Sequence, residues 1–294
     1  MVRHLRQHVK IFSLAMSGFI LLCMADCCFA QTNPGKVTKE KSTANSRDLS
    51  QDSKEIIAWA AKTYRIEIVW KNVPYPIVLR EERKSLEGVN PPKEAVEAVL
   101  PGLRAALAKY PRELPHAVGL SRIILGTQLK ASGIHIGGYS NPPSKSLILE
   151  IQEGENQVFK SITLHHEIFH LIDRALLGQF AKQDLVWARL NGPNFKGYQV
   201  GDGWKWMAQQ PGQAKPKAEP GFVSAYSMSS IPEDKAEVFA HLMENPAALT
   251  EMAGKDAVIR AKVDRMKQLV RQANPKMDHK FFEKLAAASK ESDR

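Results

Sequence analysis

The sequence predicts an α+β fold in which a small mixed sheet precedes a long helix and a helical C-terminal region. Two patterns support this prediction. Short apolar runs, separated by turns rich in Gly, Asn and Pro, occupy residues 120–151 and are typical of short strands. Apolar residues then recur at helical spacing over residues 156–177, and further helical patterns follow Pro232.

The remaining elements follow from the same periodicities and from the positions of the prolines. The segment 178–221 is rich in Gly, Pro and Gln and predicts a long irregular connection. The expected elements, in order, are a helix over about 52–64, a strand over 65–70, a helix from Pro91 or Pro92 to Pro111 that Pro101 interrupts, strands over 120–125, 133–138 and 146–151, a helix over about 156–177, a helix over 232–244 and a helical region after Pro246.

The first 30 residues have the pattern of a secretory signal peptide. Arg3, Arg6 and Lys10 form a basic start, an apolar stretch covers residues 11–25, and cleavage is expected after Ala30. An uncleaved membrane anchor is the alternative, although the apolar stretch is shorter than the ~20 residues that a span needs. We therefore expect a secreted, periplasmic or cell-envelope protein that has no stable membrane insertion once the signal is removed.

The distribution of cysteines limits the chemistry that the exported chain can use. All three, Cys23, Cys27 and Cys28, lie in the segment expected to be removed. The exported chain then has no disulfides, no cysteine nucleophile and no cysteine ligand for a metal. Any metal site must be built from histidines and carboxylates.

Composition and charge predict the organisation of the rest of the chain. Residues 31–53 are polar and predict a disordered linker, and residues 54–294 are expected to form a single domain. The formal net charge of +10 is spread along the sequence, with no run of five like charges. Because aromatic residues do not interleave with basic ones, we expect no nucleic-acid partner. The sequence does not indicate an oligomeric state.

His166-Glu167-Ile168-Phe169-His170 is an H-E-x-x-H motif within the long helix expected over residues 156–177. On a helix, positions i and i+4 share one face, so His166 and His170 can bind the same Zn²⁺. Glu167 stands where a carboxylate can act as general base toward a water on that metal. Such a five-residue pattern also arises by chance. However, two histidines and a glutamate on a mostly buried helix are costly unless a partner such as a metal satisfies them.

The third metal ligand must come from elsewhere in the chain. A metzincin needs Gly at position 173 and His at position 176, and Asp173 and Leu176 exclude that class. A catalytic zinc with two histidines usually takes a carboxylate as its third ligand. Glu233 is the expected ligand, because it heads a helix on which Glu237 follows one turn later. We expect Glu237 to accept a hydrogen bond from a ligand histidine.

A second interpretation of Glu233 needs no metal. Ser230 and Glu233 also fit the S-x-x-E capping box at the start of a helix, and Pro232 fits its first turn. Capping explains Glu233, but it leaves the second acid, Glu237, without a role.

Together these residues resemble the gluzincin metallopeptidases, and most closely the branch of the anthrax lethal factor-like and Pro-Pro endopeptidases. The resemblance rests on the H-E-x-x-H motif, on Glu233 and Glu237, on Tyr226 seven residues before Glu233, and on Asp173 three residues after His170. It implies a zincin-like fold, one catalytic Zn²⁺ and hydrolysis of a peptide or protein substrate.

The resemblance also implies roles for the residues around the metal. Tyr226 would stabilise the oxyanion, although an ordinary buried tyrosine is the alternative. Asp173 would support the metal ligands. A substrate backbone would pair with a sheet edge beside the helix, formed by residues 133–138 or by residues 146–151. From another functional class, the chain could be a non-catalytic zinc-binding domain for surface interactions, which would have no need of Glu167 as a base.

Overall fold

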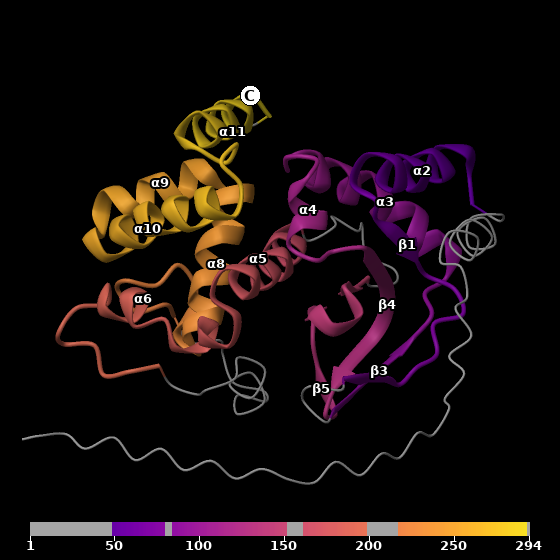
Figure 1. The fold of residues 1–294 in the computed structure, drawn as a ribbon, viewed down its shortest axis with the longest axis horizontal. Coiled ribbons are helices and arrows are strands. Elements are labelled where there is room, and N and C mark those ends of the chain that lie inside the picture. Colours follow the sequence, from indigo (N-terminus) through magenta and orange to yellow (C-terminus); the bar gives the residue numbers. More distant parts are fainter. Residues whose placement is uncertain (1–48, 80–83, 152–160, 199–216, 293–294) are drawn as a thin grey trace, which may run out of the picture.

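A computed structural model describes residues 49–79, 84–151, 161–198 and 217–292 (Figure 1). The expected signal peptide and residues 31–48 of the expected linker lie outside these ranges. The described residues form an α+β structure with a small mixed sheet and a helical C-terminal region. The predicted fold class is therefore confirmed.

The N-terminal half consists of the sheet and the helices that pack beside it. Helix α2 (Gln51–Tyr64) packs against α3 (Lys93–Ala108) and against the first strand. A short helix, α4 (Leu114–Ala117), leads into the central strand. The strands are β1 (Glu67–Val69), β2 (Ile77–Leu79), β3 (Lys84–Val89), β4 (Arg122–Ala131), β5 (Ile134–His135), β6 (Gly138–Asn141) and β7 (Ser146–Glu150).

The sheet is organised around the long strand β4. The described strands follow the order β2-β3-β4-β7-β6, and β1 and β5 also pair with β4. Strands β1 and β7 run parallel to the first half of β4, whereas β3 and β5 run antiparallel to its second half. Strand β6 is antiparallel to β7 and is the last strand on that side. It lies beside the long helix that follows.

Strand β7 lies between β4 and β6 and is buried on both faces, because an apolar cluster packs against each face. Its side chains alternate between two apolar clusters. Leu147 and Leu149 belong to the main core with the helices, and Ile148 faces a smaller cluster with Leu79 and Leu86. This explains why residues 146–151 form a continuous apolar run rather than an alternating one.

The C-terminal half is helical and contains the two helices that carry the predicted metal ligands. Helix α5 (Ser161–Leu177) packs along α8 (Ile231–Glu244), and the two lie side by side at the centre of Figure 1. The other elements are the 3₁₀ helix η2 (Gly178–Gln183), α6 (Leu185–Arg189), the 3₁₀ helix η3 (Tyr226–Met228), α9 (Pro246–Lys255), α10 (Ala257–Ala273) and α11 (His279–Ser292). Within the described part of the chain, no helix is long and apolar enough to cross a membrane.

Three sequence expectations differ from the structure. Helix α2 already begins at Gln51, so the last residues of the expected linker are helical; the Ser50 hydroxyl accepts a hydrogen bond from the Ser53 N–H, and Leu49 is buried. Pro101 does not interrupt α3, since the buried apolar face on both sides of it outweighs one lost backbone hydrogen bond. Strands β2 and β3 were not expected, because their hairpin carries only weak alternation.

Candidate metal site

Helix α5 presents its motif toward both the sheet and α8. Residues 164–169 are all buried, and so are Leu171, Ile172 and Asp173. His166 and Glu167 are each 7 % exposed, which is unusual for residues of this polarity. The apolar residues of the same helix pack against the core on its other sides, and this fixes the direction in which the two histidines point.

Helix α8 begins close to these histidines, and its first turn brings Glu233 to them. The Ser230 hydroxyl accepts a hydrogen bond from the Glu233 N–H at 3.4 Å, so Ser230 caps the helix as the sequence allowed. The Glu233 carboxylate, however, is directed at the histidines of α5. Capping and contact with the histidines are therefore compatible, because one uses the backbone of Glu233 and the other its side chain.

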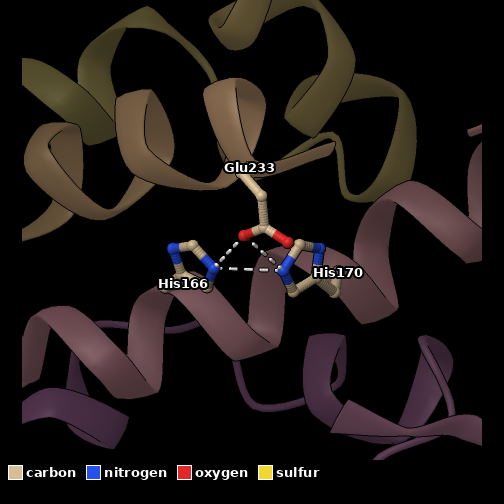
Figure 2. A group of neighbouring side chains, drawn as sticks. All are labelled: His166, His170 and Glu233. Atoms are coloured by element: carbon tan, nitrogen blue, oxygen red, sulfur yellow. Dashed lines mark hydrogen bonds and ion pairs between the residues drawn. The ribbon is translucent and has the colours of Figure 1, made fainter. Parts of the chain in front are cut away.

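Three potential ligand atoms converge between α5 and α8 (Figure 2). The Nε2 atoms of His166 and His170 lie 3.1 Å apart. Glu233 Oε2 lies 2.9 Å from His166 Nε2 and 3.5 Å from His170 Nε2. Around a tetrahedral Zn²⁺ with ligand bonds of about 2.0–2.1 Å, such atoms would be roughly 3.3 Å apart. The spacing of this group therefore suits zinc.

Glu237 adds a chemical reason for a cation at this position. Its Oε1 lies 2.9 Å from His166 Nδ1, and its Oε2 accepts a hydrogen bond of 2.6 Å from the Ser224 hydroxyl. A carboxylate can only accept, so the His166 proton resides on Nδ1. In neutral His166 the Nε2 lone pair then faces a carboxylate oxygen and a second imidazole nitrogen. A proton or a metal ion between these atoms would satisfy that arrangement.

The pKa values show how strongly this site favours positive charge. Burial lowers the pKa of His166, but the hydrogen bonds and charges of Glu233 and Glu237 outweigh burial and raise it well above the usual range. Burial raises the pKa of Glu233, but the two histidines outweigh it and hold the pKa well below the usual range. The carboxylate is thus an anion that a metal can bind without displacing a proton.

Glu167 lies against the sheet edge rather than in the ligand group. The backbone N–H of Ser140 in β6 favours its ionised form. Burial raises the pKa of Glu167, and the two nearby histidines partly offset this effect. Gly138 allows the close approach, since a Cβ at that position would lie 3.0 Å from Glu167 Cγ.

Tyr226 lies at the start of η3, on the same side of the site as Glu233 and Glu237. Its ring centroid is 5.8 Å from that of His166, and its hydroxyl forms a hydrogen bond with Glu233. Burial and the neighbouring carboxylates raise the pKa of Tyr226 well above the usual range. The hydroxyl therefore keeps its proton and can act as a hydrogen-bond donor.

Asp173 bonds Lys235, and its expected role in supporting the metal ligands stays a prediction. Its carboxylate accepts a hydrogen bond of 2.6 Å from the ammonium of Lys235, which makes an ion pair between α5 and α8. Two other histidines also point elsewhere. His165 is fully buried and bonds the Tyr110 hydroxyl through Nδ1, and His241 bonds the backbone carbonyl of Glu237.

Several residues that shape the site carried no recognisable signal in the sequence. They are Ser224, Gly138 and the backbone of Ser140, and each acts through a contact between segments far apart in the chain. The sheet edge beside α5 is β6, of which the expected 133–138 segment supplies only Gly138. The other candidate edge, residues 146–151, is wrong because β7 is an interior strand.

Comparisons with known proteins give one match. No family model matches the chain, and no curated protein matches its sequence. Among solved structures, the fold is similar to a crystal structure from Bacteroides caccae named a "putative zinc-binding metallo-peptidase". The alignment has 15 % sequence identity and a TM-score of 0.47, and it covers 84 % of this chain and 97 % of that one.

Proposed function

We propose that this chain is an exported zinc-dependent peptidase. The observation that carries the proposal is the convergence of His166 Nε2, His170 Nε2 and Glu233 Oε2 beside a buried glutamate that takes no part in the ligand group. A site with three protein ligands leaves one position for water, which is typical of catalytic rather than structural zinc. Export follows from the signal-peptide pattern in the sequence.

The histidines and Glu233 would hold the ion, and Glu237 would keep His166 in the tautomer whose Nε2 is free to bind it. When bound, zinc supplies Lewis-acid polarisation of a carbonyl and lowers the pKa of a water to about 7. The protein's part is to keep these ligands in place before the ion arrives. The distances of 2.9 Å and 3.5 Å from Glu233 Oε2 on α8 to the two histidines on α5 meet that requirement.

Glu167 is the proposed general base and then general acid. Its carboxylate would accept a proton from the attacking water as the new C–O bond forms. It would return that proton to the amine nitrogen as the C–N bond breaks, so that no net proton is taken up. Its raised pKa suits both steps, because a carboxyl with a pKa nearer neutrality holds the transferred proton more readily.

Two further groups would act on the substrate. The Tyr226 hydroxyl would donate a hydrogen bond to the oxygen of the scissile carbonyl as negative charge develops there. The outer edge of β6, which is the last of the described strands on that side, would pair with an extended peptide backbone, since this strand lies beside α5. Both roles are consistent with a peptide or protein as substrate.

The second candidate function is a non-catalytic zinc-binding domain that takes part in surface interactions. Structural zinc sites usually have four protein ligands, and the group in the described residues has three. A buried Glu167 held close to the ligands would also have no purpose in such a domain. These observations favour the enzyme.

One experiment separates the two functions. Bound metal and cleavage of a peptide library are measured for the protein, for Glu167→Gln and for Glu233→Ala. We expect one zinc per chain in the protein and in Glu167→Gln, with cleavage only by the former, and a loss of zinc affinity of at least about 100-fold in Glu233→Ala. Zinc without cleavage in the unaltered protein would support the binding domain. Absence of zinc would exclude both functions.

A further inference from the structure

We propose that Lys235 is a positioning residue that fixes α8 against α5 and thereby holds Glu233 at the distance the two histidines require. This inference rests on the proposed zinc site and concerns how the site is assembled. Lys235 is fully buried, and its hydrogen-bond partners in the described part of the chain do not include a proposed zinc ligand.

The ammonium of Lys235 connects three segments. It lies 2.6 Å from Asp173 Oδ1 on α5 and 3.3 Å from Asp184 Oδ2, the residue that caps α6. It also donates to the backbone carbonyl of Ala181 at 3.4 Å. All three hydrogens of the ammonium therefore have acceptors. A buried lysine with this set of partners has a single orientation.

The ion pair lies next to the ligand group on both helices. Asp173 follows His170 by three residues, about one helical turn. Lys235 follows Glu233 by two residues. The pair therefore joins the same two helices that the metal would join, one turn further along α5. Any shift of α8 along α5 must change this ion pair and the distance from Glu233 to the histidines together.

The apolar contacts between α5 and α8 fix the distance from Glu233 to the two histidines less narrowly than the ion pair does. Phe169 and Phe239 pack with their ring centroids 5.2 Å apart, and such contacts tolerate small displacements. An ion pair at 2.6 Å between fully buried groups does not, because a charge that loses its partner in the interior is costly. Buried ion pairs of this kind seldom add net stability over apolar residues, so a role in fixing geometry accounts better for the presence of Lys235.

The chain contains a matched control on the same helix. Asp234, the residue before Lys235, forms a buried ion pair of 2.7 Å with Lys262, which is also fully buried. This pair joins α8 to α10, which carries none of the proposed ligands. Removing Lys262 leaves one buried aspartate without its ion pair and removing Lys235 leaves two, so both changes should cost stability. Only the loss of Lys235 should alter the zinc site.

The test compares zinc affinity in Lys235→Met, Lys262→Met and the unaltered protein. Dissociation constants are measured by competition with a chromophoric chelator, at a temperature where circular dichroism shows each protein folded in EDTA. We expect Lys235→Met to bind zinc about 10–100-fold more weakly, because outer residues of metal sites typically have effects of that size. Lys262→Met should stay within about threefold of the unaltered protein.

Asp173→Asn provides the same test from α5 if Lys235→Met does not fold. It keeps the shape of the side chain and one oxygen acceptor but removes the charge, and we expect zinc binding about 3–10-fold weaker. The positioning role is overturned if Lys235→Met and Asp173→Asn bind zinc as tightly as the unaltered protein does. It is also overturned if Lys262→Met loses as much zinc affinity as Lys235→Met. Absence of zinc binding in the unaltered protein would instead show that the proposed function itself is wrong.

Discussion

The contact between strand β6 and the proposed general base allows a sharp test through one missing methyl group. Gly138 lies where β6 passes α5, and a Cβ at this position would lie 2.9 Å from Thr163 Cγ2. The same atom would lie 3.0 Å from Glu167 Cγ and 3.1 Å from Glu167 Oε1. Gly138→Ala must therefore displace Thr163, Glu167, the strand or a combination of these by a few tenths of an ångström.

The cost follows from two opposing effects. Overpacking a buried contact typically costs about 1–3 kcal/mol. Replacing Gly by Ala where the backbone conformation is compatible recovers about 0.4–1 kcal/mol by restricting the unfolded chain. We therefore expect the free energy of unfolding to fall by about 1–2 kcal/mol in Gly138→Ala. Since a misplacement of 1 Å can cost about 100-fold in rate, a shift of a few tenths should lower kcat/KM by about tenfold.

Urea unfolding measures the free energy of unfolding, and peptide cleavage measures kcat/KM. Zinc affinity should stay within about threefold of the unaltered protein, because the added methyl group does not contact the ligand group. Gly137→Ala is the matched control. A Cβ at Gly137 meets Thr163 only at 3.8 Å, an ordinary contact, so that variant should be neutral or slightly stabilised and fully active. If Gly138→Ala cleaves peptides as well as Gly137→Ala does, contact with β6 does not hold Glu167 in its active position.

Two further predictions concern the surroundings of the site. Glu237→Gln should weaken zinc binding by about 10–100-fold, because an amide can present its NH₂ to His166 Nδ1 and no longer fixes the tautomer of that histidine. Competition with a chelator measures the zinc affinity, and an unchanged affinity would contradict the role of Glu237. Glu244 lies at the end of α8, where His165, together with Lys109 and against the effect of burial, lowers its pKa from 4.5 to about 2. Because the pKa of Glu244 is depressed in the folded state, its ionised carboxylate stabilises the fold. This contribution is complete above about pH 4.5 and is lost as the pH falls toward 2. We expect it to amount to about 1–2 kcal/mol after allowance for the partial exposure of the side chain. Urea titrations in EDTA at pH 6 and pH 3 should therefore show a larger loss of stability in the unaltered protein than in Glu244→Gln, and equal losses would refute the assignment.

The sequence was most informative where local rules determine the outcome. The spacing of His166 and His170 fixes both on one helical face, whatever the rest of the chain does. The start of α8 was equally readable, because Ser230 and Pro232 are local signals for a helix N-terminus. The apolar run of β7 also follows from its own composition, although its interior position in the sheet does not.

The sequence was least informative where one residue faces two candidate partners. Asp173 was expected to support the metal ligands, and nothing in the spacing could show that Lys235, 62 residues later, lies within hydrogen-bond distance. Gly138 ends the strand expected over residues 133–138, and only the packing of β6 against α5 explains why a glycine occupies this position. Likewise, the hairpin β2–β3 depends on pairing with β4 more than on its own pattern.

By itself, the sequence determined the H-E-x-x-H pair, the confinement of all three cysteines to the first 28 residues and the presence of a later helix with two glutamates, since each depends on residue type and short-range spacing. Only the tertiary structure decided which carboxylate faces which atom: Glu233 toward both Nε2 atoms, Glu237 toward His166 Nδ1, Glu167 toward β6 and Asp173 toward Lys235. The physical reason is that a carboxylate accepts equally well from an imidazole, an ammonium or a backbone N–H. Its partner is therefore chosen by the packing of α5, α8 and β6, which long-range contacts determine.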